Sequence, residues 1–187
     1  MGYFPMMVDM NDKSVLVVGG GEEGVKKIRI LRAFGAHITL IDKNAGGEAI
    51  AESDEYIEGP FSDEVMDKNE YEMVVASTDD RDLNRHISDL AKERRIPVNV
   101  VDDVELCTFI FPAIYQKKDV VCAVSSGGKS PYVAQYVRDR ISNVLPDDIG
   151  EINEKMGEFR KQARERFADS SDRRRFLKEK FNELIGF

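Results

Sequence analysis

The feature that most constrains the fold of this chain is a glycine-rich run between a short apolar segment and a helical pattern. Residues 14–18 read Ser-Val-Leu-Val-Val, and residues 19–24 read Gly-Gly-Gly-Glu-Glu-Gly. The run matches G-x-G-x-x-G directly after a predicted strand and at the start of a predicted helix, which is the context that indicates dinucleotide binding. The alternative is a glycine turn in an α/β fold that binds no nucleotide.

The glycines of this run have separate physical tasks. Gly19 permits the tight turn, Gly21 lets the main chain approach a pyrophosphate, and Gly24 lets the helix and strand pack closely. Free amide groups and the helix dipole at this terminus attract anions, so we predict that dinucleotide phosphates bind here. Gly20 completes the predicted cofactor-binding turn.

Charged residues modify this prediction. Glu22 and Glu23 place negative charge near the expected phosphates, so we expect both side chains to point to solvent while the amides bind. Asp42 closes the next apolar run, 18 residues beyond Gly24, where an acid can accept hydrogen bonds from the adenosine ribose. This favours NAD over NADP, although Lys43 weakens the preference.

Short apolar runs alternate with helical patterns over the first two thirds of the chain, which predicts an α/β fold with a Rossmann-like parallel sheet. Strands are predicted at residues 14–18, 37–41, 55–58, 72–77 and 96–101, and helices at 22–34, 48–53 and 81–95. An acidic loop is expected between residues 58 and 70.

The pattern changes after residue 103. Residues 119–125 predict a strand and residues 131–145 an amphipathic helix, while 148–185 predict two or three charged helices with a break near 168–172. We therefore predict three parts: a Rossmann-like domain over 1–112, a region over 113–146 and a small all-helical C-terminal domain over 147–187.

A second loop, at residues 125–131, also joins a predicted strand to a helix. Gly128-Lys129-Ser130 matches the end of a phosphate loop, but Ala123 stands where that motif needs its first glycine, so we discount a nucleoside-triphosphate site. An amide-rich and hydroxyl-rich loop with one lysine suits carboxylates. A plain helix cap with Pro131 in the first turn explains it equally well.

Asp102 and Asp103 end the last predicted strand of the sheet, at the edge where ligands of parallel sheets bind. Either carboxylate could act as a general base, and a helix cap or surface turn is an equal alternative. We expect structural roles for His37 and His86, and we predict no metal site.

Composition narrows the class of protein. Residues 1–150 carry 17 Lys+Arg against 27 Asp+Glu, and residues 151–187 carry 10 against 8, so neither part resembles a nucleic-acid binder. The sequence has no apolar run long enough to span a membrane and no secretory pattern at its start, and it has only two cysteines. We expect a reduced, cytoplasmic enzyme or binding domain.

Six segments, taken in order, resemble the precorrin-2 dehydrogenase/sirohydrochlorin ferrochelatase family of siroheme synthesis. They are Phe4-Pro5, VLVVGGGEEG, VVASTDD, NVVDD, CTFIFPAI and AVSSGGKSP. The resemblance implies NAD-dependent oxidation of precorrin-2, a tetrapyrrole with eight carboxylates, to sirohydrochlorin. It also implies a homodimer whose central part, residues 113–146, serves dimerisation and tetrapyrrole binding.

The resemblance also implies site residues. Asp102 matches the family's catalytic aspartate, and Ser126 a serine of the tetrapyrrole pocket that is phosphorylated in some relatives. The implied cofactor residues add Lys43, Asn44, Ser77 and Thr78 to Asp42 and the glycine run; the implied substrate residues are Ser125, Ser126, Gly127, Gly128, Lys129 and Arg138.

Two departures from the family leave questions open. The 187 residues leave no room for the methyltransferase domain of larger relatives, and no histidine matches the one linked to chelation, so insertion of ferrous iron stays open. Competing functions are a dehydrogenase of another anionic small molecule, an NAD-sensing module without turnover, and a tetrapyrrole carrier or chelatase that has lost dehydrogenation.

Overall fold

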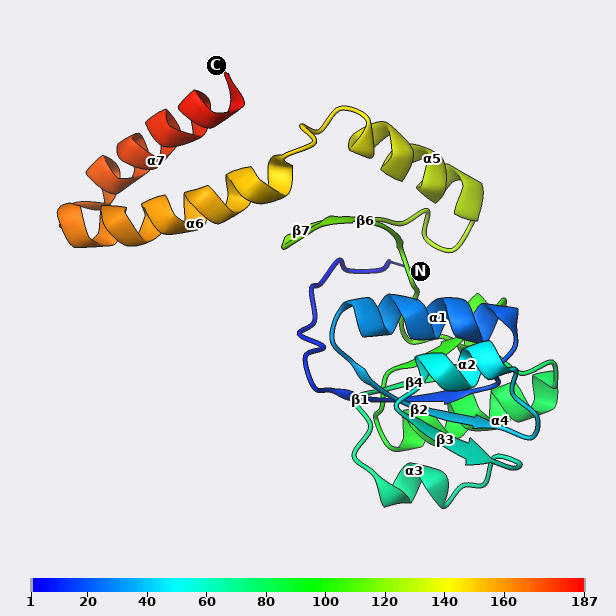
Figure 1. The fold of residues 1–187 in the computed structure, drawn as a ribbon. Helices are drawn as coiled ribbons and strands as arrows, with labels where there is room; N and C mark the ends of the chain where they lie inside the picture. The colour runs from blue at the N-terminus through cyan, green and yellow to red at the C-terminus, as the bar shows by residue number, and fades with distance from the viewer. Residues whose placement is uncertain (1, 187) are drawn as a thin grey trace. The chain divides into compact units, whose positions relative to one another are not determined.

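A five-stranded parallel sheet forms the centre of the first part of the computed structural model, which describes residues 2–186 and, for Lys68, the backbone alone (Figure 1). Its strands are β1 (Ser14–Val18), β2 (His37–Asp42), β3 (Glu55–Glu58), β4 (Met73–Ala76) and β5 (Val98–Val100). They follow the order β3-β2-β1-β4-β5, and all neighbours pair in parallel. This is the Rossmann order, so the predicted fold class is confirmed.

Helices cover both faces of this sheet because its central strand is apolar on both sides. Val15 and Val17 pack in one buried cluster with residues of α1 (Glu22–Ala33) and α2 (Gly47–Glu52). Leu16 and Val18 point the other way and pack with residues of α3 (Val65–Lys68) and α4 (Arg81–Glu93). A strand buried on both faces has a continuous apolar sequence, which is what residues 14–18 show.

The second part of the chain combines a hairpin with three helices. Strands β6 (Ala113–Lys117) and β7 (Val120–Val124) pair antiparallel, and α5 (Pro131–Ser142), α6 (Ile149–Arg166) and α7 (Ser170–Ile185) follow. Lys118, in the hairpin turn, pairs with Glu151 at 3.2 Å and with Glu154 at 2.6 Å. These contacts hold the hairpin against the start of α6.

The contacts divide the chain into two units, one ending at Phe111 and the other starting at Pro112. The predicted division into three parts, with boundaries at residues 112 and 146, stays a prediction. Among the described residues, no helix is both long enough and apolar enough to cross a membrane.

Three local expectations need correction. The segment predicted as an acidic loop contains the short helix α3, whose Val65 and Met66 are buried against the sheet. Strand β6 is missing from the predicted strands, because Pro112 interrupts the apolar pattern just before the strand begins. Helix α5 ends at Ser142, three residues earlier than expected. The tail forms two helices, which agrees with the expectation, and their separation at residues 167–169 overlaps the predicted break.

Candidate functional site

The glycine turn after β1 closes through two contacts that only glycine permits. Gly19 has φ +101°, and a Cβ there would lie 2.5 Å from the Ser77 carbonyl oxygen. A Cβ on Gly24 would lie 2.2 Å from the Gly19 carbonyl oxygen. The turn therefore lies directly against the end of β4, and α1 lies directly against the turn, as the sequence predicts for both glycines.

Gly21 faces open space instead. No atom lies within 4 Å of the place where its Cβ would be, and as the residue before α1 it makes no side-chain cap. The first amide groups of an α-helix have no partner within the helix, and they carry the positive end of its dipole. The space at Gly21 and these amides fit the pyrophosphate of a dinucleotide.

The two acids of the turn are neutralised in part by one lysine. Lys26 Nζ lies 2.8 Å from Glu22 and 2.7 Å from Glu23, whose side chains are 85% and 46% exposed. The hydrogen bond from Lys26 lowers the pKa of Glu22, and both acids raise the pKa of Lys26. Their exposure agrees with the expectation that the side chains point to solvent, which leaves the amides to an anion.

Asp42 fixes the second side of the turn. Its Oδ2 accepts the Gly20 amide at 2.6 Å and its Oδ1 accepts the Asn44 amide at 2.8 Å. A carboxylate has about four acceptor sites, so capacity for ribose hydroxyls remains. Lys43, between these residues, is exposed.

Ser77 and Thr78, which follow β4, support the turn. Both hydroxyl groups donate hydrogen bonds within the protein. Ser77 Oγ donates to the Gly19 carbonyl at 2.8 Å. Thr78 Oγ1 donates to Asn84 Oδ1 at 2.7 Å, and Asn84 Nδ2 donates back to the Thr78 carbonyl at 2.8 Å. A direct cofactor contact by Ser77 or Thr78 stays a prediction.

Asn84 is a site residue that sequence reasoning missed. Its side chain is buried, with a relative exposure of 6%, on the face of α4 that also carries Ile87. Asn84 shares the buried face of α4 with Ile87, Ser88 and Ala91. An amide side chain at a helical position predicted to face the sheet is the signal that could have identified it, because a buried amide needs partners.

The two aspartates after β5 have different environments. Asp103 pairs with Arg81 at 3.1 Å, and its side chain is 16% exposed. Asp102 is exposed and has φ +60°, a left-handed conformation in which aspartate is enriched. The Val101 amide bonds to the Ala76 carbonyl at 2.9 Å, so this turn lies beside the start of the Ser77 loop. Asp102 therefore presents a carboxylate at the carboxyl ends of the parallel strands, where the glycine turn also lies.

The second predicted loop, in the other unit, is built as a helix cap. Ser130 Oγ accepts the Val133 amide at 3.3 Å, and Pro131 stands in the first turn of α5, so the loop does form the helix cap that the sequence offered as an alternative. Binding of a carboxylate by the same loop stays a prediction. Ser126 Oγ accepts the Ser130 amide at 2.9 Å, and Ser125 Oγ accepts a further amide in the loop. Both hydroxyls can still donate to a ligand.

The cations of this unit differ in availability. Lys129 is exposed at the tip of the loop, beside Gly127 and Gly128, both of which have positive φ. Arg138 pairs with its neighbour Asp139 at 2.6 Å. Lys129 is therefore the better-placed cation for a carboxylate ligand.

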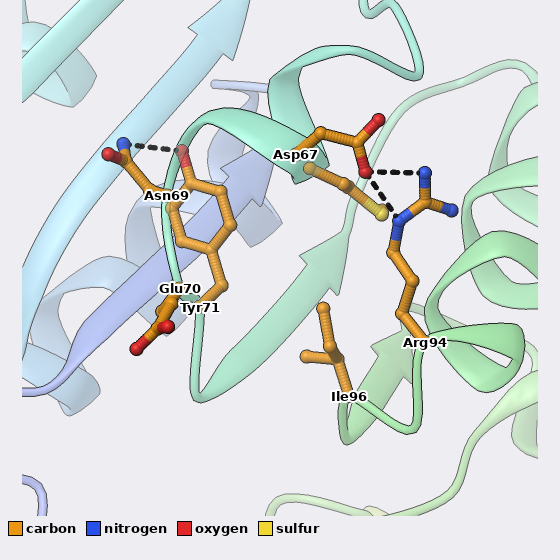
Figure 2. A pocket seen from close by; sticks show the side chains of 7 residues that line it. Asp67, Asn69, Glu70, Tyr71, Arg94 and Ile96 are labelled. Atoms are coloured by element: carbon orange, nitrogen blue, oxygen red, sulfur yellow. Dashed lines mark hydrogen bonds and ion pairs between the residues drawn. The ribbon is translucent and has the colours of Figure 1, made fainter.

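Other candidate groups lie away from the glycine turn. His86 Nε2 lies 2.7 Å from Asp63 Oδ1 on the surface, and residues 2–186 contain no group of three or more side chains suited to hold a metal. A hollow of about 420 Å³ lies at the amino ends of β4 and β5, where Arg94 contacts Asp67 at 2.7 Å (Figure 2). The predicted cofactor residues lie at the other end of the strands, at their carboxyl ends.

Comparisons with known proteins show the family to which the chain belongs. A family described as "Putative NAD(P)-binding" matches residues 6–113. The siroheme synthase of Ruthia magnifica subsp. Calyptogena magnifica is 36% identical over 187 residues, which cover 99% of this chain and 40% of that protein. The siroheme synthase of Thioalkalivibrio sulfidiphilus is 38% identical, with coverage of 94% and 36%. The chain thus spans about two fifths of the length of these curated relatives.

A solved structure shares the fold. The structure titled "SirC, precorrin-2 dehydrogenase" superposes with a TM-score of 0.72 over 98% of both chains, at 20% sequence identity. At this identity the likeness establishes the fold, including the Rossmann order of the sheet.

The contacts of Gly21 and Gly24 predict that the same substitution has a small effect at one position and a large effect at the other. Gly24→Ala should destabilise the protein by about 2 kcal/mol or more, because its methyl group overlaps the Gly19 carbonyl. Gly21→Ala should change the free energy of unfolding by less than about 1 kcal/mol, because its methyl group meets no atom. Urea unfolding without ligand measures both, and equal losses would contradict the assigned geometry.

Proposed function

We propose that this chain binds NAD at the glycine turn and oxidises precorrin-2 to sirohydrochlorin. The premise is that the chain belongs to the NAD(P)-binding family whose model matches residues 6–113. The observation that carries this proposal is the placement of Asp102 at the sheet edge that also holds the open Gly21 turn. The names of the relatives, siroheme synthase and precorrin-2 dehydrogenase, support the substrate.

The residues of the first unit divide the work of holding the coenzyme. The amides of Gly21, Glu22 and Glu23 bind the pyrophosphate, and Asp42 accepts hydrogen bonds from the adenosine ribose. NAD, when bound, supplies the acceptor for a hydride from the substrate carbon. The acid at the ribose position favours NAD over NADP, whose 2′-phosphate it would repel.

Asp102 accepts the proton that remains when hydride leaves the carbon framework. Arg81 already pairs with Asp103, so of the two aspartates that follow β5 Asp102 is the better-placed proton acceptor. The exposed position of Asp102 gives a substrate access to the carboxylate.

The second unit binds the carboxylate groups of the substrate. Residues 112–187 carry 15 Lys+Arg against 12 Asp+Glu, whereas residues 1–111 carry 12 against 23, so a polycarboxylate is repelled less by the second unit. The Ser125–Ser126 hydroxyls and Lys129 offer donors to carboxylates in one loop. We propose that this loop and Arg138 bind the propionate and acetate groups of the tetrapyrrole.

A second copy of the chain is proposed to cover α5. Four apolar residues lie on one stripe of this helix and are strongly exposed: Tyr132 at 80%, Val133 at 55%, Tyr136 at 64% and Val137 at 38%. Contiguous exposed apolar surface of this kind marks interaction sites, and burial in a homodimer would remove it from water.

A cytoplasmic location fits the NAD dependence and the free thiols Cys107 and Cys122.

An anaerobic assay with precorrin-2 tests the proposal as a whole. The chain with precorrin-2 and NAD should produce NADH and the visible spectrum of sirohydrochlorin in equal amounts, and should do neither when NAD is omitted. Ferrous iron added afterwards reports whether siroheme also forms. NAD binding without any NADH would favour a sensing module, and NADH formed only with another anionic substrate would favour a different dehydrogenase.

Asp102→Asn tests the proton acceptor. Asparagine tolerates the positive φ of this position, so the variant should fold, bind NAD as before and lose about 100-fold or more in kcat. Glu105→Gln is the matched control, since it removes one exposed carboxylate from the same segment and should keep wild-type turnover. A fully active Asp102→Asn variant would remove Asp102 from the chemistry.

A further inference from the structure

The outer side of the edge strand β5 is covered by residues 107–108, through two side chains and the Thr108 amide, instead of by another strand. β5 pairs with β4 on one side only. On its other side the Val98 amide donates to Thr108 Oγ1 at 2.8 Å, and the Val100 amide donates to Cys107 Sγ at 3.1 Å. Two consecutive side chains thus take the acceptor positions that a neighbouring strand would supply.

The Cys107 thiol also joins the two ends of the turn that carries Asp102. Its Sγ lies 3.2 Å from the Val100 carbonyl oxygen and 3.3 Å from the Asp103 carbonyl oxygen, and it can donate its one proton to either. The turn's own backbone bond, from the Asp103 amide to the Val100 carbonyl, is long at 3.4 Å. The thiol therefore adds a second bridge between residues 100 and 103, beside this long backbone bond.

The chemical state of Cys107 suits this bridging role. The side chain is partly buried, and burial raises the pKa of its thiol above the ordinary value. The thiol keeps its proton at neutral pH and can act as donor and acceptor together, whereas a reactive cysteine needs a lowered pKa.

Asp102 depends on this bridge because its backbone conformation has to be imposed. A non-glycine residue at φ +60° is in a sparsely populated region that the surrounding structure must hold. The residues on either side of the turn are held at Val101, by the Ala76 carbonyl, and at Asp103, by Arg81. The thiol contacts complete this set from inside the turn.

We infer that Cys107 is a positioning residue for the proposed dehydrogenation, which sets the direction of the Asp102 carboxylate through the Val100–Asp103 turn. This inference rests on the proposed function for its catalytic consequence. Cys107 itself touches neither substrate nor cofactor, and it forms no covalent bond in the reaction.

The test compares Cys107→Ala with Thr108→Val in the full chain. Each variant removes one side-chain acceptor from a β5 amide, and both should lower the Tm by a similar few degrees. Only Cys107→Ala changes the Asp102 turn. It should lower kcat on the order of tenfold to a hundredfold, because small misplacements of a reacting group have effects of that size, with the KM for NAD unchanged.

Two further readouts separate positioning from general stability. Cys107→Ser keeps a donor and an acceptor on a shorter bond and should recover part of the lost kcat. Amide hydrogen exchange should accelerate at Val100 and Asp103 in Cys107→Ala, and at Val98 in Thr108→Val.

The outcomes are distinct. If wild-type chain forms no NADH with precorrin-2, the proposed function fails. If the wild type is active and Cys107→Ala keeps its kcat, or if Thr108→Val loses as much kcat, the inference about Cys107 fails while the proposed function stands.

Discussion

The contact between Gly24 and the Gly19 carbonyl is the constraint on which the rest of the site depends. A Cβ on Gly24 would lie 2.2 Å from that oxygen, so α1 can begin directly over the end of β1 only because glycine stands there. This approach directs the first amides of α1 outward at Gly21. It also brings Gly20 within reach of the Asp42 carboxylate, 2.6 Å away, and Gly19 within reach of Ser77 Oγ, 2.8 Å away. Cofactor geometry therefore follows from close packing.

A chain with an excess of acidic residues can bind anionic ligands because ion pairs within the chain neutralise some of its charges and leave others free. Lys26 offsets Glu22 and Glu23 beside the amides, and Arg81 pairs with Asp103, so that the carboxylate of Asp102 is left available. The excess of acids lies in residues 1–111, while residues 112–187 carry slightly more bases than acids. Overall charge gives no indication of this arrangement; the partners of individual side chains do.

Local sequence patterns predicted the sheet, its helices and the glycine turn because burial on both faces of a strand and the absence of a side chain leave direct marks in the sequence. The helix at Val65–Lys68 was missed because its acidic neighbours resemble a loop. Asn84 and Cys107 were missed for another reason: their bonds, to Thr78 and to Val100, join segments without periodicity. Strand position alone left Asp102 and Asp103 equivalent, and it was the resemblance to a family that singled out Asp102. The fold adds a physical difference, because it brings Arg81 to Asp103 and leaves Asp102 exposed.

The structure of the chain crystallised with NAD tests the central claim most directly. The pyrophosphate should lie on the amides of residues 21–23, with the adenosine ribose at Asp42 and the nicotinamide directed toward the β5 end of the sheet edge, where Asp102 stands. Density for the coenzyme at the hollow near Arg94, or an Asp102 carboxylate turned away from the nicotinamide, would contradict the account.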